Sequence, residues 1–174
     1  IDGVHDAEMI DKLGGRFGLH PLILEDIMNT DQRPKLEDLG DALYIVLRMI
    51  DFDGKGQKIE SEQLSLVVGS NFVLSFQERP GDMFDPVRER IRKGKGRIRK
   101  LGPDYLAYAL MDSVVDQYFV VLEKLGERIE TLEEELIADP RTPTLHKIHD
   151  MKREMLFLRK SIWPVREVVA GLER

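Results

Sequence analysis

The feature that most constrains the fold of this chain is a long, nearly heptad repeat of apolar residues in its C-terminal part. Over residues 104–138 these residues recur at intervals of three and four, the spacing of one buried face on a helix. A second helix with the same spacing follows a break at 139–141, and Pro164 should bend it because proline cannot donate a hydrogen bond to the Lys160 carbonyl. The short break predicts a long antiparallel helical hairpin over residues 103–174. The predicted seam consists of Met111, Val114, Tyr118, Leu122, Leu125, Ile129, Leu132 and Leu136 in the first helix, and of Met155, Leu158, Ile162, Val165, Val169 and Leu172 in the second.

Residues 1–102 have a different pattern, which predicts a compact α/β head. Apolar, β-branched and aromatic runs predict strands, and the turn residues at Asp53-Gly54 and Gly69-Ser70 predict tight connections between antiparallel neighbours. We therefore expect three antiparallel strands, at residues 42–51, 62–68 and 71–77. Helices are expected at residues 6–17, from Pro21 to about Asn29, and at 84–93.

Composition removes several classes of function. The chain has no cysteine, which excludes disulfides, thiolate zinc sites and cysteine nucleophiles. Its net charge of −6 argues weakly against nucleic acid as a partner and permits cations. No apolar run approaches the roughly 20 residues that span a bilayer. Ile1 is not a start methionine and the helical pattern is still running at Arg174, so we expect a piece of a longer protein.

The adjacent acids Glu25 and Asp26 are the first candidate site. Asp26 lies at the edge of the apolar face of its helix, so it is either paired with Arg33 or Lys35 or available to a cation. Oxygen ligands alone suit Mg²⁺ or Ca²⁺. Catalysis is the weakest interpretation, because adjacent helical residues point about 100° apart instead of converging on a substrate.

A second candidate acid, Asp112, lies beside the predicted seam of the long helix and shares a face with Asp116. A polar residue at such a position either fixes the register of the helices or binds a cation. The acidic run at 123–139 is interpreted as a solvated face.

The remaining charged features do not predict a chemical site. The basic run at 88–100 contains no aromatic residue to stack on bases, so we expect a structural or inter-subunit role and no nucleic-acid partner. His146 and His149, with Asp150 beside them, are too few for a transition-metal centre. There is no phosphate-binding glycine loop and no nucleophile–histidine pairing, so we do not expect an enzyme.

Six stretches, in order along nearly the whole chain, resemble the CorA family of magnesium transporters. They are FGLHPLILEDI (17–27), QRPKLE (32–37), SEQLSLVVGSNFVLSFQE (61–78), FDPVRERI (84–91), DYLAYALMDSVVDQYF (104–119) and LRKSIWPVREV (158–168). The long pore helix, the second membrane helix and the Gly-Met-Asn motif of that family are not present in these residues.

The resemblance implies an αβα sandwich head with antiparallel strands, followed by the long helical hairpin, on the cytoplasmic side of a cell (inner) membrane protein. It implies a homopentamer around one pore, joined to the membrane through the missing C-terminal part, with Mg²⁺ both as transported and as regulatory ion. Glu25 and Asp26 match family positions that form regulatory Mg²⁺ sites between adjacent subunits, and Asp112 matches a further acidic position of this kind. The counterpart carboxylate lies on the neighbour's pore helix, so one copy of this soluble fragment would hold only half a site.

Three other functions remain open at the level of the sequence. One is a transporter of Zn²⁺, Co²⁺ or Ni²⁺ from the same superfamily, although the lack of cysteine and the few histidines favour a harder ion. Another is a soluble coiled-coil interaction protein that binds a partner through the apolar hairpin seam. A third is a nucleic-acid-binding module that uses residues 88–100.

Overall fold

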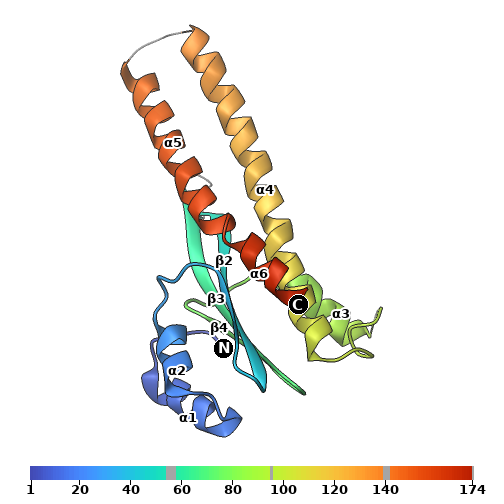
Figure 1. Ribbon diagram of the computed structural model, residues 1–174. Helices are drawn as coiled ribbons and strands as arrows, with labels where there is room; N and C mark the ends of the chain where they lie inside the picture. Colours follow the sequence, from blue (N-terminus) through green and yellow to red (C-terminus); the bar gives the residue numbers. More distant parts are fainter. Residues whose placement is uncertain (54–57, 95, 139–141, 174) are drawn as a thin grey trace.

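Four strands between residues 35 and 77 pair in chain order into one antiparallel sheet, and helices cover both of its faces in the computed structural model (Figure 1). The structure describes residues 1–53, 58–94, 96–138 and 142–173. The strands are β1 (Lys35–Asp38), β2 (Ala42–Phe52), β3 (Ile59–Gly69) and β4 (Val73–Gln77). The helices are α1 (Ala7–Phe17), α2 (Pro21–Met28), α3 (Asp85–Lys93), α4 (Pro103–Ala138), α5 (Thr142–Ile162) and α6 (Val165–Leu172).

The two central strands are buried on both faces, which explains their nearly continuous apolar sequences. Alternate residues of a strand point to opposite faces. In β2, Ile45 and Leu47 belong to the core formed with α3, α4, α5 and α6, whereas Tyr44 and Val46 belong to the core formed with α1 and α2. The αβα sandwich with an antiparallel sheet is therefore confirmed.

The expectation of three strands was wrong, because β1 adds a fourth at the edge of the sheet. Its four residues pair with β2, with Lys35 opposite Val46 and Asp38 opposite Leu43. Charged side chains are common on edge strands, where they discourage pairing with other chains. Leu36 is the only apolar residue in the strand, so β1 lacked the apolar alternation that the prediction required.

The turn between β3 and β4 was correctly predicted, but its glycine has a different role. The Gly69 N–H donates to the Phe72 carbonyl over 3.0 Å and so closes a turn centred on Ser70 and Asn71. A Cβ atom at Gly69 would lie 2.4 Å from the Phe72 ring, so a larger residue there would force the ring to move. For the Asp53-Gly54 turn, Gly54 lies outside the described residues; the flanking strands pair with Phe52 opposite Ile59.

The predicted helical hairpin is present, with α4 and α5 running antiparallel (Figure 1). The break that we expected at 139–141 lies outside the described residues. Pro164 does interrupt the second helix: α5 ends at Ile162, α6 begins at Val165, and the two differ in direction in Figure 1.

The predicted seam was wrong at several positions, because the first half of α4 packs mainly on the sheet instead of on another helix. Val114, Tyr118 and Leu125 are buried as expected, but Val121 is fully buried while Leu122 is 44% exposed. The seam also fails at other exposed positions: Ile129, Met155, Val169 and Leu172.

One apolar core joins the sheet to the helical hairpin. Ile45 and Leu64 of the strands share it with Val114 of α4 and Leu158 of α5. The Tyr118 hydroxyl donates to the Arg48 carbonyl over 2.6 Å and ties α4 to β2. Across the described residues, no helix combines the length and apolar character needed to cross a membrane.

Candidate functional site

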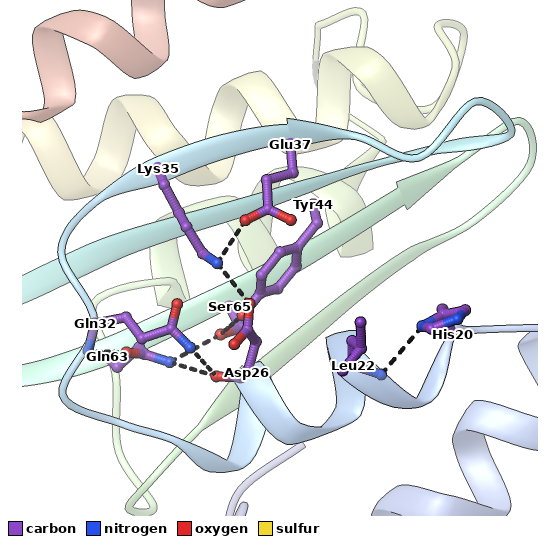
Figure 2. Close-up of polar contacts among 9 residues, drawn as sticks. All are labelled: His20, Leu22, Asp26, Gln32, Lys35, Glu37, Tyr44, Gln63 and Ser65. Carbon is purple, nitrogen blue, oxygen red and sulfur yellow. Dashed lines mark hydrogen bonds and ion pairs between the residues drawn. The ribbon is translucent and has the colours of Figure 1, made fainter.

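Helix α2 presents the first pair of candidate acids at the surface. Pro21 occupies the first helical position as predicted, and the His20 Nδ1 accepts a hydrogen bond from the Leu22 N–H over 3.2 Å (Figure 2). Ile23 and Ile27 are buried against the sheet. This orientation places Asp26 at the edge of the buried face, as the sequence indicated.

Asp26 is joined to β1 by a three-residue charge cluster (Figure 2). The Lys35 ammonium lies 2.5 Å from Asp26 Oδ2 and 2.6 Å from Glu37 Oε1. Lys35 and Glu37 share one face of β1 because they are two residues apart. The Lys35 and Asp26 side chains are 23% and 31% exposed, so solvent still reaches the pair. Of the two partners considered for Asp26, the structure selects Lys35, and Arg33 is exposed.

The lysine of the cluster packs against the ring of a buried tyrosine. Lys35 Nζ lies 5.4 Å from the centre of the Tyr44 ring, within the range of a cation–π contact. Burial lowers the pKa of Lys35, but the hydrogen bonds and negative charges of Asp26 and Glu37 outweigh this effect and leave it above 10.5. Burial also raises the pKa of Tyr44, whose hydroxyl lies 3.2 Å from Ser65 Oγ. Lys35 is therefore a permanent cation.

Two glutamine side chains hold the backbone under Asp26. The Asp26 carbonyl belongs to the last turn of α2, where carbonyls lack helical partners. It accepts hydrogen bonds from Gln32 Nε2 at 3.0 Å and Gln63 Nε2 at 3.3 Å. The buried Gln63 also donates to Ser65 Oγ and accepts from the Gln32 N–H. These contacts fix the end of α2, and with it the position of the Asp26 carboxylate.

The other two predicted ligands lie apart from this cluster. Glu25 is exposed on α2, and no described residue bonds to its side chain. Asp112 is exposed on α4, which packs on the opposite face of the sheet from α2. Within the described residues, no three acidic or histidine side chains gather closely enough to hold a metal ion. Glu25, Asp26 and Asp112 thus do not form one site in a single copy.

The donor chemistry nevertheless fits a hard cation. Asp26 Oδ1 accepts no hydrogen bond from the described residues, and the carboxylate is partly exposed. Glu25 and Asp112 offer further exposed carboxylates. Mg²⁺ characteristically keeps several waters and binds through one or two carboxylates, so it does not require three converging ligands from one chain.

In the other charged features, two arginines of the basic run have structural partners. In the basic run, Arg88 forms ion pairs with Asp82, which is 4% exposed, and with Asp85. Arg90 donates to the Tyr105 hydroxyl over 3.2 Å. Burial raises the pKa of Asp82, but the Arg88 guanidinium and further hydrogen bonds keep it below 3.8. His146 and His149 are both exposed on α5.

Sequence reasoning missed part of the cluster. Tyr44 was not considered, and Glu37, Gln63 and Ser65 were only quoted within matching stretches. One available signal was the polar pair Gln63 and Ser65, which alternate in a strand whose neighbours are apolar. Polar residues at alternate positions share a face, and on a covered face they require partners.

Comparison with known proteins gives the family. The model of the family described as "CorA-like Mg2+ transporter protein" matches residues 2–174. The chain belongs to the CorA family. It is 49% identical to the cobalt/magnesium transport protein CorA of Thermotoga maritima over 174 residues, which are 100% of this chain and 50% of that protein. It is 30% identical to the putative metal ion transporter YfjQ of Bacillus subtilis, covering 88% of this chain and 46% of the relative.

Two solved structures share the fold. The soluble domain of CorA from Methanocaldococcus jannaschii matches with a TM-score of 0.79 at 21% identity, over 96% of this chain and 66% of that one. Full-length CmaX matches with a TM-score of 0.83 at 22% identity, over 99% of this chain and 52% of that one. The chain spans about half the length of the curated relatives named here.

Proposed function

We propose that this chain is the Mg²⁺-sensing, gating part of a CorA-family transporter that moves Mg²⁺, and also Co²⁺, across the cell membrane. Membership of the family and 49% identity to a protein named for cobalt and magnesium transport support this assignment. The chain would lie on the cytoplasmic side, attached to a membrane part in the C-terminal half that the relatives possess. We expect no enzymatic activity and no nucleic-acid partner.

The proposed sensor is a site shared between subunits of a homopentamer. Asp26 would bind the ion at the boundary with a neighbouring copy, with Glu25 and Asp112 as supporting ligands. Carboxylates that face each other across a boundary repel, and a divalent ion between them replaces repulsion with attraction. An ion that binds the closed assembly more tightly than the open one shifts the population toward closed, and its depletion releases the pore.

One observation carries the assignment of the site: Asp26 is held in place while one of its carboxylate oxygens stays available to a ligand. Its backbone carbonyl accepts hydrogen bonds from Gln32 and Gln63, and its Oδ2 is bonded to Lys35. Its Oδ1 accepts no hydrogen bond from the described residues. A ligand of this kind, acting through retained waters, would bind weakly. Weak binding suits an ion that is abundant in cells.

The test is transport by the full-length protein at high internal Mg²⁺. Asp26→Asn should leave transport running at internal Mg²⁺ concentrations that silence the wild type, while Glu25→Gln and Asp112→Asn should shift the shut-off less. Asp11→Asn removes an exposed acid from α1 and serves as the control. If the Asp26→Asn variant shuts off at the wild-type concentration, Asp26 is not the sensor.

A zinc transporter has weaker support. The structural match to a ZntB cytoplasmic domain has a TM-score of 0.60 at 15% identity, so it bears on the fold alone. Uptake of Zn²⁺ in preference to Mg²⁺ by the full-length protein would reverse this choice of ion.

A further inference from the structure

We propose that Lys35 is a built-in cation that occupies Asp26 when Mg²⁺ is absent and transfers to Glu37 when Mg²⁺ binds. This inference rests on the proposed function and adds a residue that sets the affinity of the site. Lys35 would compete directly with the ion for the same carboxylate. Glu37 would receive the displaced ammonium group, so that its charge stays paired in both states.

The geometry supports a transfer over a very short path. The Lys35 ammonium already bonds both carboxylates, at 2.5 Å to Asp26 and 2.6 Å to Glu37 (Figure 2). A lysine ammonium has three donors on a flexible stem, so it can leave one acceptor while it keeps the other. Displacement from Asp26 therefore requires no movement of the backbone.

The fold keeps Lys35 close to the site even when it releases Asp26. Its backbone is paired with Val46 at the edge of the sheet, and its ammonium lies 5.4 Å from the centre of the Tyr44 ring. Glu37 projects from the same face of the same strand and is more exposed than Lys35, at 41% against 23%. The alternative partner is thus the more solvated carboxylate, and Asp26 is freed for the incoming ion.

The charge of the cluster sets the expected effect. Asp26, Lys35 and Glu37 together carry a net charge of −1, so Mg²⁺ is attracted to the cluster but is repelled by the ammonium. For an ion held through retained waters, Coulomb repulsion between a unit charge and a divalent ion roughly 6–12 Å apart in water corresponds to roughly three- to tenfold in affinity, and added salt reduces it. Removing the positive charge should therefore tighten Mg²⁺ binding by about this factor.

The experiment is a Mg²⁺ titration of the full-length assembly at constant ionic strength, with binding measured as the internal Mg²⁺ concentration that silences transport. Lys35→Met keeps most of the stem and should tighten binding about three- to tenfold. Glu37→Gln should weaken binding, because Lys35 then has only Asp26. The matched control is Lys12→Met, which removes the same charge from an exposed ion pair with Glu8 at 2.6 Å, and it should leave binding unchanged.

A double variant separates the transfer from general electrostatics. Loss of the Glu37 charge weakens binding in either background, but if Glu37 also acts by receiving Lys35, Glu37→Gln should weaken binding more in the wild type than beside Lys35→Met. Equal effects of Glu37→Gln in both backgrounds would overturn the transfer. Unchanged or weaker binding in Lys35→Met would overturn the competition, provided that Asp26→Asn abolishes the wild-type response. A Mg²⁺ response that is missing in every variant, or that survives Asp26→Asn, would overturn both the inference and the proposed site.

Discussion

Replacing Gln63 with leucine and Gln32 with alanine, singly and together, tests how the end of α2 is held beneath Asp26. Both amides donate to the same Asp26 carbonyl, at 3.3 Å and 3.0 Å. Either substitution alone leaves that carbonyl with one donor. The double substitution leaves it with none from the described residues, so the two changes should not be additive.

The magnitudes follow from the hydrogen bonds lost. Gln32→Ala removes one bond and should cost about 0.5–1.5 kcal/mol of the free energy of unfolding. Gln63→Leu also leaves the Gln32 N–H without its 3.1 Å acceptor, so we expect about 2–3 kcal/mol. The double variant should lose about 1 kcal/mol more than the sum, since an unpaired, partly buried carbonyl adds its own penalty.

Urea denaturation of the four proteins measures this coupling directly. In a chain of this size, each kcal/mol corresponds to a shift of the melting temperature of about 2–4 °C, so a thermal scan gives an independent check. Costs that add to within about 0.5 kcal/mol would refute the shared-carbonyl argument. The control is Ser65→Ala, which removes the hydroxyl that Gln63 and Tyr44 both contact but leaves the two donors to the Asp26 carbonyl in place.

Three further predictions concern the rest of the fold. Pairing with Arg88 lowers the pKa of Asp82 below 3.8, so the ionised carboxylate stabilises the fold above that pH and loses this effect as the pH falls through the lowered pKa. Asp82→Asn should therefore cost about 2 kcal/mol of the free energy of unfolding at pH 7 and flatten the acid limb of a curve of stability against pH. An unchanged acid limb would contradict this. Tyr118→Phe removes the 2.6 Å bond to the Arg48 carbonyl and should cost about 1–2 kcal/mol in urea denaturation, whereas a neutral effect would mean that water replaces the hydroxyl. Gly126→Ala adds a carbon that meets nothing within 4 Å apart from its own stretch of helix. It should raise stability by about 0.5–1 kcal/mol in the same assay, and a loss of stability would contradict this.

The sequence predicted the elements that have strong local signals. The long helix over 104–138 was located by its regular apolar spacing, and the strands at 42–51, 62–68 and 71–77 by their apolar and β-branched runs between turn residues. β1 was missed because a short edge strand gains its stability from pairing with β2, and nothing in its own residues reports that partner. Leu122 was expected to be buried but is exposed, and its neighbour Val121 is buried, because the sheet, and not a second helix, determines which face of α4 is buried.

The candidate site was predicted only in part, for a similar reason. Asp26 and its possible partner Lys35 could be found from nearby sequence, since they are nine residues apart. Gln63 is 37 residues from Asp26, and their contact depends on how α2 crosses the sheet. Long-range contacts of this kind follow from tertiary packing and leave little trace in local composition.

The central claim is that Asp26 is the ligand of a regulatory cation, and locating that cation tests it most directly. The measurement is an anomalous-scattering crystal structure of the full-length assembly with Mn²⁺ in place of Mg²⁺. Our account predicts a Mn²⁺ peak beside the Asp26 carboxylate at a subunit boundary, directly or through one water, with the Lys35 ammonium on Glu37. An assembly that binds Mn²⁺ elsewhere, with Asp26 still paired to Lys35 in every copy, would contradict it.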